Sequence, residues 1–206
     1  MMKRLLAGIF RVFLLISCKL ITGVQARWLS PPTNRVRIYY ANHSSHLDGI
    51  VLWSCFPANL RNTIHPVAAK DYWGKSRLKR FIAEDVFNSI LITRKPRSQD
   101  NPLNVLENIL SQYQSLILFP EGTRGSGEQI ADFKCGLFYL AKQFPQIEMV
   151  PVYLSNLNRV LPKGSKLLVP IICYATFGEP IQPLNEGETK NSFLTRAKQA
   201  LEELAP

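Results

Sequence analysis

The segment RVRIYYANHSSHLDGIVLWSCF, residues Arg35–Phe56, joins a strand pattern, a short polar turn and a helix pattern in direct succession. Arg35–Ala41 alternates and is rich in β-branched and aromatic residues, which predicts a strand. His46–Phe56 is apolar with a helical period, which predicts a helix. A strand that leads directly into a helix is the repeating unit of α/β proteins, so this segment sets the expected fold class.

Strand and helix patterns continue to alternate along the 206 residues of the chain. Strands are expected at Thr63–Lys70, Asn88–Arg94, Ser115–Leu118, Glu148–Ser155 and Lys166–Ile181. Helices are expected at Tyr72–Val86, Pro102–Tyr113, Lys134–Phe144 and Lys190–Leu204. This alternation predicts a single α/β domain with a mixed, largely parallel sheet flanked by helices. The length suffices for one sizeable core.

The first 30 residues form an apolar segment with regularly spaced cations. At about 100° per residue, one narrow stripe of a helix is polar and the rest of its surface is apolar. The stripe consists of Arg4, Arg11, Cys18, Thr22 and Gln25, with Lys19 beside it. The cations interrupt the uncharged run that a spanning helix needs. We therefore predict an amphipathic helix at a membrane interface over residues 1–30, followed by the α/β domain over residues 31–206.

Two other interpretations of this segment remain open. It could be a helix that covers the core of a soluble domain. It could also be a secretory or lipoprotein signal, since Leu15–Cys18 reads LISC, similar to a lipobox. Arg11 within the apolar region and the absence of a small-residue cleavage site argue against that signal.

Charge and cysteine content narrow the expected partners. The chain has 25 Lys and Arg against 15 Asp and Glu, a formal net charge of +10. This excess suits an anionic membrane or a phosphorylated substrate. No arginine-rich arm, zinc-finger spacing or RNA-binding motif is present, so nucleic acid is not an expected partner. The four cysteines are widely spaced, which predicts free thiols in a reducing compartment.

The polar turn in the opening segment has a structural and a catalytic interpretation. Ser45 and Asp48 have the S-x-x-D spacing of a capping box at a helix start. His43 lies directly before that helix and is not explained by capping. Asp48 could accept a hydrogen bond from one imidazole nitrogen and leave the other as a general base. His43, His46 and Asp48 are also permitted metal ligands, but a catalytic zinc site needs further ligands, and the chain has one other histidine, His65. We predict no metal and treat His46 as a bystander.

A second polar group follows the strand at Ser115–Leu118. The segment FPEGTR, Phe119–Arg124, offers a glycine for close backbone approach, a hydroxyl and a guanidinium group suited to phosphate. A plain polar turn with a Glu–Arg pair is the alternative. Lys134 at an expected helix start and Arg94 at an expected strand end add cations where anions bind in α/β proteins.

Taken in this order, the segments resemble the glycerolipid acyltransferases, and among them the 1-acylglycerol-3-phosphate (lysophosphatidic acid) acyltransferases. Asn42–Asp48 (NHSSHLD) is similar to the family's N-H-x-S-x-x-D, and Phe119–Arg124 matches its third block. Shorter similarities lie at Ala68–Lys70, Val150–Val152 and Phe177–Ile181. The second block departs from the family: Asn88 and Thr93 occupy the places of a glycine and of an acidic or amide residue, while Ile92 and Arg94 are kept.

The resemblance implies transfer of a fatty acyl group from acyl-CoA or acyl-carrier protein to the free hydroxyl of a lysophospholipid, without a cofactor. It implies that His43 is the base, that Asp48 orients it, and that Lys70 stabilises the tetrahedral oxyanion. Asn42 and Ser45 would hold the turn next to the substrate. The acceptor's phosphate would be bound by Arg94, Gly122, Thr123 and Arg124. Glu121 would position an arginine or a glycerol hydroxyl, and Lys134 would face the phosphate or be structural.

The implied location is the cytoplasmic face of a membrane, the inner membrane in a bacterium. The basic residues Lys75, Arg77, Lys79 and Arg80 would contact anionic lipid or acyl-carrier protein, or form a solvated helix face. Three alternatives remain: an acyltransferase for another lysolipid, a thioester or ester hydrolase, and a non-catalytic lipid-binding protein. The absence of G-x-S-x-G argues against a serine esterase.

Overall fold

The protein is described here as a computed structural model that covers residues 2–93, 101–160 and 169–206. Its centre is a seven-stranded sheet in the order β1-β7-β6-β2-β5-β3-β4. The strands are β1 (Gln25–Trp28), β2 (Arg37–Ala41), β3 (Ile64–Ala69), β4 (Ile90–Ile92), β5 (Ser115–Leu118), β6 (Glu148–Ser155) and β7 (Tyr174–Phe177). Strands β6 and β7 pair antiparallel, and the other described pairs are parallel. The predicted α/β class with a mixed, largely parallel sheet is confirmed.

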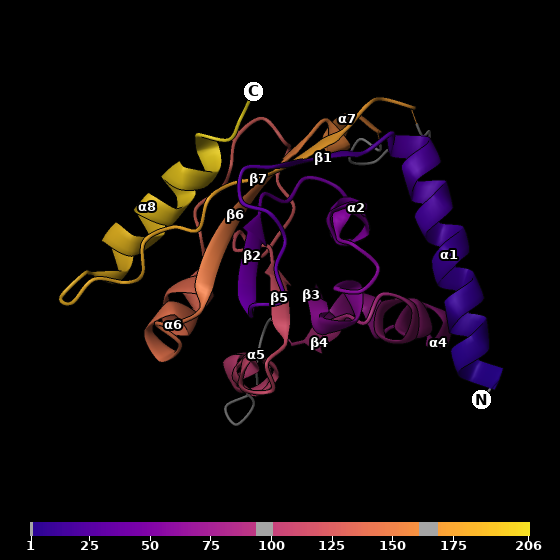
Figure 1. Ribbon diagram of the computed structural model, residues 1–206, viewed down its shortest axis with the longest axis horizontal. Helices are drawn as coiled ribbons and strands as arrows, with labels where there is room; N and C mark the ends of the chain where they lie inside the picture. The colour runs from indigo at the N-terminus through magenta and orange to yellow at the C-terminus, as the bar shows by residue number, and fades with distance from the viewer. Residues whose placement is uncertain (1, 94–100, 161–168) are drawn as a thin grey trace.

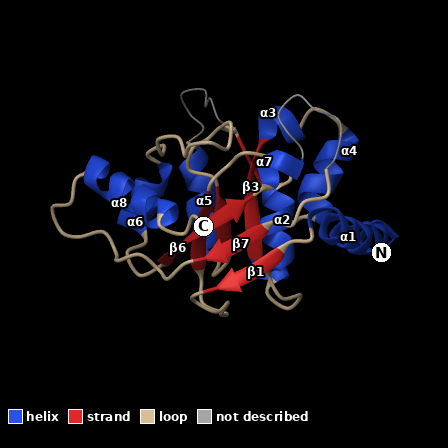
Figure 2. Cartoon of the chain, turned by 90° about the horizontal axis from the view of Figure 1, so that it is seen from above, coloured by secondary structure: helices blue, strands red, loops and turns tan. Residues whose placement is uncertain are grey.

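Helices cover both faces of this sheet (Figure 1). One layer contains α1 (Met2–Thr22), α2 (Asp48–Cys55), α3 (Lys70–Trp73), α4 (Arg77–Arg80), the π-helical segment η2 (Phe81–Val86) and α7 (Leu157–Val160). The other contains α5 (Pro102–Ser111), α6 (Gly136–Gln143) and α8 (Lys190–Glu202), seen from above in Figure 2. A 3₁₀ turn, η1, spans Arg61–Thr63. Each layer buries its own apolar cluster against the sheet, as expected for parallel strands covered on both faces.

Helix α1 packs with its polar stripe toward the protein and its apolar surface outward. Arg11 Nε donates to Val86 O at 2.7 Å, while Cys18 and Thr22 are buried. The side chain of Arg4 lies outside the described residues. The outward side chains are more than half exposed at Leu5, Leu6, Ile9, Val12, Phe13, Ile16 and Leu20. Because Arg11, Cys18 and Thr22 face the protein, the outward surface of α1 is mostly apolar, although Lys3 and Lys19 are also exposed.

By length and composition, Leu5–Thr22 is apolar enough to cross a membrane despite its two cations, with a mean hydropathy of 2.0. Only 17% of that window is buried in the protein. Buried core helices and signal sequences pass the same test of length and composition. The low burial is what sets α1 apart from a core helix.

The N-terminal helix ends earlier than predicted, and an additional strand follows it. Gly23 has a φ of 51°, a left-handed conformation that commonly ends helices. Gln25, which the helical period placed on the polar stripe, begins β1 and pairs with Tyr174 of β7. Within the expected helical segment 1–30, residues Gln25–Trp28 thus belong to the sheet. Strand β1 was missed because its four residues have too little pattern to be separated from the preceding helix.

The helix predicted over Tyr72–Val86 is also interrupted. Helix α3 ends at Gly74, and Ser76 starts α4 by accepting a hydrogen bond from the Lys79 backbone N–H at 3.2 Å. A serine at this position satisfies a free helical donor and so favours a new helix start. The resulting bend places α3 at the same sheet edge as the polar turn after β2.

Candidate active site

The carboxyl ends of neighbouring parallel strands bring the predicted polar segments together. Strands β2 and β5 are paired in parallel, with Tyr40 opposite Leu118. The turn that carries His43 leaves β2, and the segment Phe119–Arg124 leaves β5, at the same edge. Open α/β sheets place ligands at this edge because loops of adjacent strands converge there.

His43 and Asp48 form a hydrogen-bonded pair at the start of α2. His43 Nδ1 lies 2.8 Å from Asp48 Oδ2. The Asp48 side chain is fully buried, while that of His43 is 22% exposed. A buried carboxylate that holds one ring nitrogen fixes the imidazole's orientation and its tautomer, which leaves Nε2 available as a base. This is the base–orienter geometry that the spacing predicted.

Asp48 is itself held by the turn. Its Oδ2 accepts from the backbone N–H groups of Ser44 at 2.6 Å and Ser45 at 2.8 Å. Its Oδ1 is buried and has no hydrogen-bond partner among the described residues. Half of the predicted capping box is therefore present. The other half differs, because Ser45 Oγ accepts from the Leu47 N–H at 3.2 Å and not from that of Asp48.

Asn42 and Ser45 are buried and hold the turn that carries His43, as the resemblance implied. The Asn42 side-chain amide makes two hydrogen bonds with the Leu154 backbone of β6, at 3.0 and 2.7 Å. Neither residue lines the cavity described below. Their contribution to substrate binding is thus indirect, through the position of His43.

Glu121 connects the two motifs. Its Oε1 accepts from the His43 backbone N–H at 2.7 Å, and its Oε2 accepts from the Ala131 N–H at 2.9 Å. The side chain is buried, with 3% exposure. Both oxygens thus accept from backbone donors. Among the described contacts, no hydrogen bond or ion pair joins Glu121 to Arg124, as the alternative interpretation would require. The role of Glu121 in positioning an arginine or a glycerol hydroxyl stays a prediction.

Gly122, Thr123, Arg124 and Lys134 lie together along the cavity next to His43. Gly122 has a φ of 73°, and a Cβ there would come within 3.3 Å of Lys134 Cγ. Glycine is thus required both by the backbone conformation and by the lysine packed over it. Lys134 precedes α6, which begins at Gly136, later than predicted. These residues form a concentration of donors and positive charge that suits a phosphate group.

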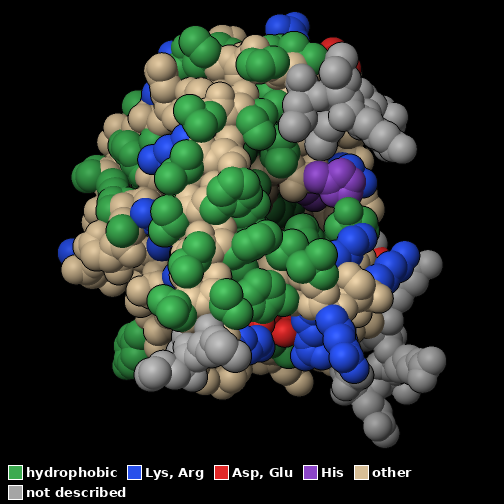
Figure 3. Space-filling view, turned by 90° about the vertical axis from the view of Figure 1, so that its right-hand side faces the viewer, with side chains coloured by type: hydrophobic (Ala, Val, Ile, Leu, Met, Phe, Trp, Pro, Cys, Tyr) green, Lys and Arg blue, Asp and Glu red, His purple; other side chains and the backbone are tan. Residues whose placement is uncertain are grey.

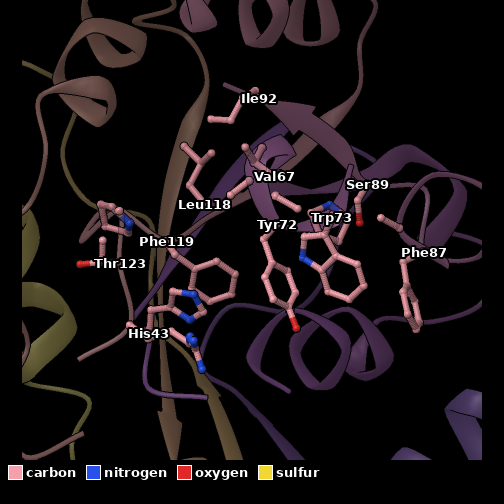
Figure 4. A pocket seen from close by; sticks show the side chains of 18 of the residues that line it. His43, Val67, Tyr72, Trp73, Phe87, Ser89, Ile92, Leu118, Phe119 and Thr123 are labelled. Atoms are coloured by element: carbon pink, nitrogen blue, oxygen red, sulfur yellow. The ribbon is translucent and has the colours of Figure 1, made fainter. Parts of the chain in front are cut away.

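The cavity has a volume of about 600 Å³ and a mostly apolar lining. Figure 3 shows it as a hollow in a face rich in apolar side chains, with histidine at its edge. In Figure 4, His43 and Phe119 lie side by side at one end of the view, with the side chains of Leu118, Val67 and Ile92 above them and those of Trp73 and Phe87 to the right. The Phe119 ring stacks on the His43 imidazole with a centroid distance of 4.4 Å. Leu14 of α1 also contributes to the wall, so α1 forms part of the cavity as well as the outer surface.

One described residue of the predicted site is not brought into this group. Lys70 opens α3, is exposed, and does not line the cavity. Arg94 lies outside the described residues. Within residues 2–93, 101–160 and 169–206, no three His, Cys, Asp or Glu side chains are grouped as metal ligands. The cavity lining also includes residues to which the sequence had given no role in the site, among them His46, Tyr72 and Phe119. For His46 a signal was available, since it is three residues from His43 in one turn.

The fold and the site define an α/β protein with an oriented histidine base beside an apolar cavity and a cationic loop. A sequence profile of the family described as Acyltransferase matches residues 30–155. The match covers more than half of the chain, and the chain belongs to this family.

Individual relatives carry consistent names. The chain is 28% identical over 143 residues to the chloroplastic 1-acyl-sn-glycerol-3-phosphate acyltransferase LPAT1 of Arabidopsis thaliana, covering 66% of this chain and 36% of that protein. It is 30% identical over 138 residues to the 1-acyl-sn-glycerol-3-phosphate acyltransferase of Helicobacter pylori, covering 66% of this chain and 55% of that protein. The chain therefore matches about a third to a half of the length of these relatives.

The fold is also shared with a solved structure. The crystal structure of the 1-acyl-sn-glycerophosphate (LPA) acyltransferase PlsC from Thermotoga maritima superposes with a TM-score of 0.66. The superposition covers 94% of this chain and 80% of that chain, at 21% sequence identity. At this identity the likeness concerns the fold.

Proposed function

We propose that this protein transfers a fatty acyl group from an acyl thioester to the free hydroxyl of 1-acylglycerol-3-phosphate, which yields phosphatidic acid. The observation that carries the proposal is the 2.8 Å His43–Asp48 pair at the edge of an apolar cavity that also contains Thr123, Arg124 and Lys134. An apolar space suits an acyl chain, and the cationic loop suits a phosphate. The names of the relatives support the same substrate.

In the proposed reaction, His43 Nε2 removes the proton of the acceptor hydroxyl as that oxygen attacks the thioester carbonyl carbon. Asp48 stabilises the imidazolium through Nδ1–H. The tetrahedral intermediate collapses, the C–S bond breaks, and the thiol leaves with the proton held by His43. Acyl-CoA and acyl-carrier protein are both suitable donors, since each presents a thioester. The reaction as written needs no covalent acyl-enzyme, because holding two substrates together supplies much of the rate gain.

The outward face of α1 supports a membrane location for this chemistry. Its exposed leucine, isoleucine and phenylalanine side chains lie on the same side of the molecule as the hollow (Figures 1 and 3). Exposed apolar area of this extent favours insertion among lipid chains. A lysolipid could then enter the cavity, and its product leave, without crossing water. We place the protein on the cytoplasmic face, where anionic lipid complements the net charge of +10.

The test is acyl transfer from labelled long-chain acyl-CoA and acyl-carrier protein to lysophosphatidic acid, with lysophosphatidylcholine and lysophosphatidylethanolamine in parallel. Wild type and His43→Ala are compared. We expect product with lysophosphatidic acid, and its loss in the variant. Release of free fatty acid at the same rate without any acceptor would instead identify a hydrolase. No turnover with either donor and any acceptor would contradict the proposal.

A further inference from the structure

His46 occupies a place at the cavity that the mechanism above does not use. It lines the same cavity as His43 and Arg124. Its ring stacks on that of Tyr72, with a centroid distance of 5.2 Å and an interplanar angle of 27°. In addition, the His46 backbone lies in the turn before α2, which is held by the hydrogen bonds that Asp48 accepts from Ser44 and Ser45. An aromatic contact and a rigid turn together fix where this imidazole lies.

Tyr72 is in turn backed by a cation. Lys79 Nζ lies 4.0 Å from the centre of the Tyr72 ring, a cation–π contact. Lys79 is only partly exposed, whereas Lys75, Arg77 and Arg80 of the same basic run are exposed. Arg80 is also paired with Glu84 at 2.8 Å. The basic run is therefore not uniform, because one of its members is directed toward the aromatic side chain that supports His46.

The charges around His46 are predominantly positive. Burial lowers the pKa of His46 from its ordinary value, and the positive charge of Arg124 lowers that pKa further, followed by His43 and Lys79. Asp48 acts in the opposite direction. A neutral imidazole among cations offers a hydrogen-bond donor, and it takes up a proton readily when an anion arrives.

The size of the acceptor places its phosphate in this region. In 1-acylglycerol-3-phosphate the reacting hydroxyl and the phosphate sit on adjacent carbons. A hydroxyl hydrogen-bonded to His43 therefore holds the phosphate within a few bond lengths of the same ring. Figure 4 shows Thr123 on one side of His43 and Tyr72 on the other. Arg124 from the β5–α6 loop and His46 from the turn before α2 line this same cavity, so both are candidates to contact a phosphate bound there.

We propose that His46 is a specificity-determining residue that hydrogen-bonds the phosphate monoester of the acceptor opposite Arg124, with Tyr72 and Lys79 as its support. This inference rests on the function proposed above. A terminal phosphate monoester carries up to two negative charges and three free oxygens, so it can engage both walls at once. A phosphodiester lysolipid has one charge and fewer free oxygens. The arrangement thus selects lysophosphatidic acid over lysolipids with larger head groups.

The experiment measures KM separately for acceptor and donor with wild type, His46→Gln and Lys142→Ala in lysophosphatidic acid acylation. Lys142 is an exposed cation on α6 that does not line the cavity. For His46→Gln we expect the acceptor KM to rise about tenfold or more, the size of losing a hydrogen bond to a charged group. The donor KM should stay within about twofold, and both KM values should stay within about twofold in the Lys142→Ala control. Tyr72→Leu, which removes the stacking partner, should raise the acceptor KM by a smaller factor.

A pH series separates binding from a structural role. From pH 6 to 8, the ratio of acceptor KM in His46→Gln to that in wild type should be largest at the acidic end, because protonated His46 binds the anion more strongly there. Unchanged acceptor KM in both His46→Gln and Tyr72→Leu would overturn the inference, as would a rise in the donor KM alone. Absence of transfer in wild type would contradict the proposed function itself, which is a separate outcome.

Discussion

Glu121 Oε1 accepts a hydrogen bond from the His43 backbone N–H at 2.7 Å, and this contact joins the two motifs across 78 positions of sequence. The Gly125 N–H donates to His43 O at 2.8 Å in the same region. Both backbone polar groups of His43 are thus bound to the loop that follows β5. His43 and the cationic loop are therefore connected through two hydrogen bonds, so that displacement of either should displace the other.

Replacement of Glu121 by Gln tests this connection. Glutamine keeps one acceptor oxygen but turns an NH₂ group toward the donor of either His43 or Ala131. A buried donor that loses its partner costs about 1–3 kcal/mol. We therefore expect a lower melting temperature. We also expect kcat to fall and the acceptor KM to rise. A variant with wild-type kinetics and a lowered melting temperature would show that the link serves stability alone.

Gly122→Ala, compared with Gly187→Ala, tests the conformation of the cationic loop. The two glycines have φ values of 73° and 75°, but only at Gly122 would a Cβ approach another residue, Lys134. Left-handed alanine costs about 1–2 kcal/mol at either site. We therefore expect both variants to lose a similar amount of stability. The acceptor KM should rise in Gly122→Ala but not in Gly187→Ala. Denaturant titration measures the stability of each variant, and initial rates give its acceptor KM. Equal acceptor KM values for the two variants would exclude a role for Gly122 in binding.

Asp48→Asn tests how the base is oriented. Asparagine can still accept from Ser44 and Ser45 through its oxygen, but it no longer stabilises an imidazolium. We expect kcat to fall by about 10²–10⁴-fold, the usual scale for a disabled general base, with little change in either KM. Circular dichroism spectra and melting curves provide the control for folding. A loss below tenfold in a folded variant would show that Asp48 has a mainly structural part.

Substitution of the outward face of α1 tests the membrane contact. Ile9, Phe13 and Ile16 are 55–61% exposed, so changing all three to Gln should leave the packing intact. In a flotation assay we expect the variant not to float with anionic liposomes. Each aliphatic or aromatic side chain buried in the membrane contributes about 1.5–3 kcal/mol to binding, and the variant loses three of them. Val105→Gln on α5, also exposed, is the matched control and should still float. Unchanged flotation of the triple variant would contradict lipid contact through this face.

Thiol reactivity provides a test of the packing around α1. Burial raises the pKa of Cys55 to about 12 and that of Cys173 to about 11, and it also raises the pKa of Cys18. A raised pKa keeps these thiols protonated and unreactive at pH 8, whereas Cys135 is exposed. Mass spectrometry after brief alkylation at pH 8 should show modification at Cys135 first. Early modification of Cys18 would show that α1 detaches from the domain in solution.

The local sequence was sufficient for the features that depend on neighbouring residues. The alternation in Arg35–Ala41, the apolar run of β5 and the eight residues of β6 each predict a strand through side-chain pattern alone. The spacing of His43 and Asp48 likewise predicts a pair, because a turn that leads into a helix brings side chains five positions apart close together. Where the pattern was short, as in β1, or where Gly74 and Ser76 broke a helix, the prediction failed.

Other features depend on contacts between distant segments. The sequence of α1 indicates an amphipathic helix but not which face meets the protein; the carbonyls of Asp85 and Val86, which bind Arg11, turn the polar stripe inward. Similarly, Glu121 reads as an arginine partner until the fold brings the His43 and Ala131 N–H groups to it. His46 reads as a bystander until α3 places Tyr72 against it. The sequence by itself determined most of the elements and the His43–Asp48 pair, because hydrophobic period and turn chemistry act over a few residues. Only the tertiary structure decided which buried donors, acceptors and rings would meet, because each such group is satisfied by whatever the sheet order brings within hydrogen-bonding distance.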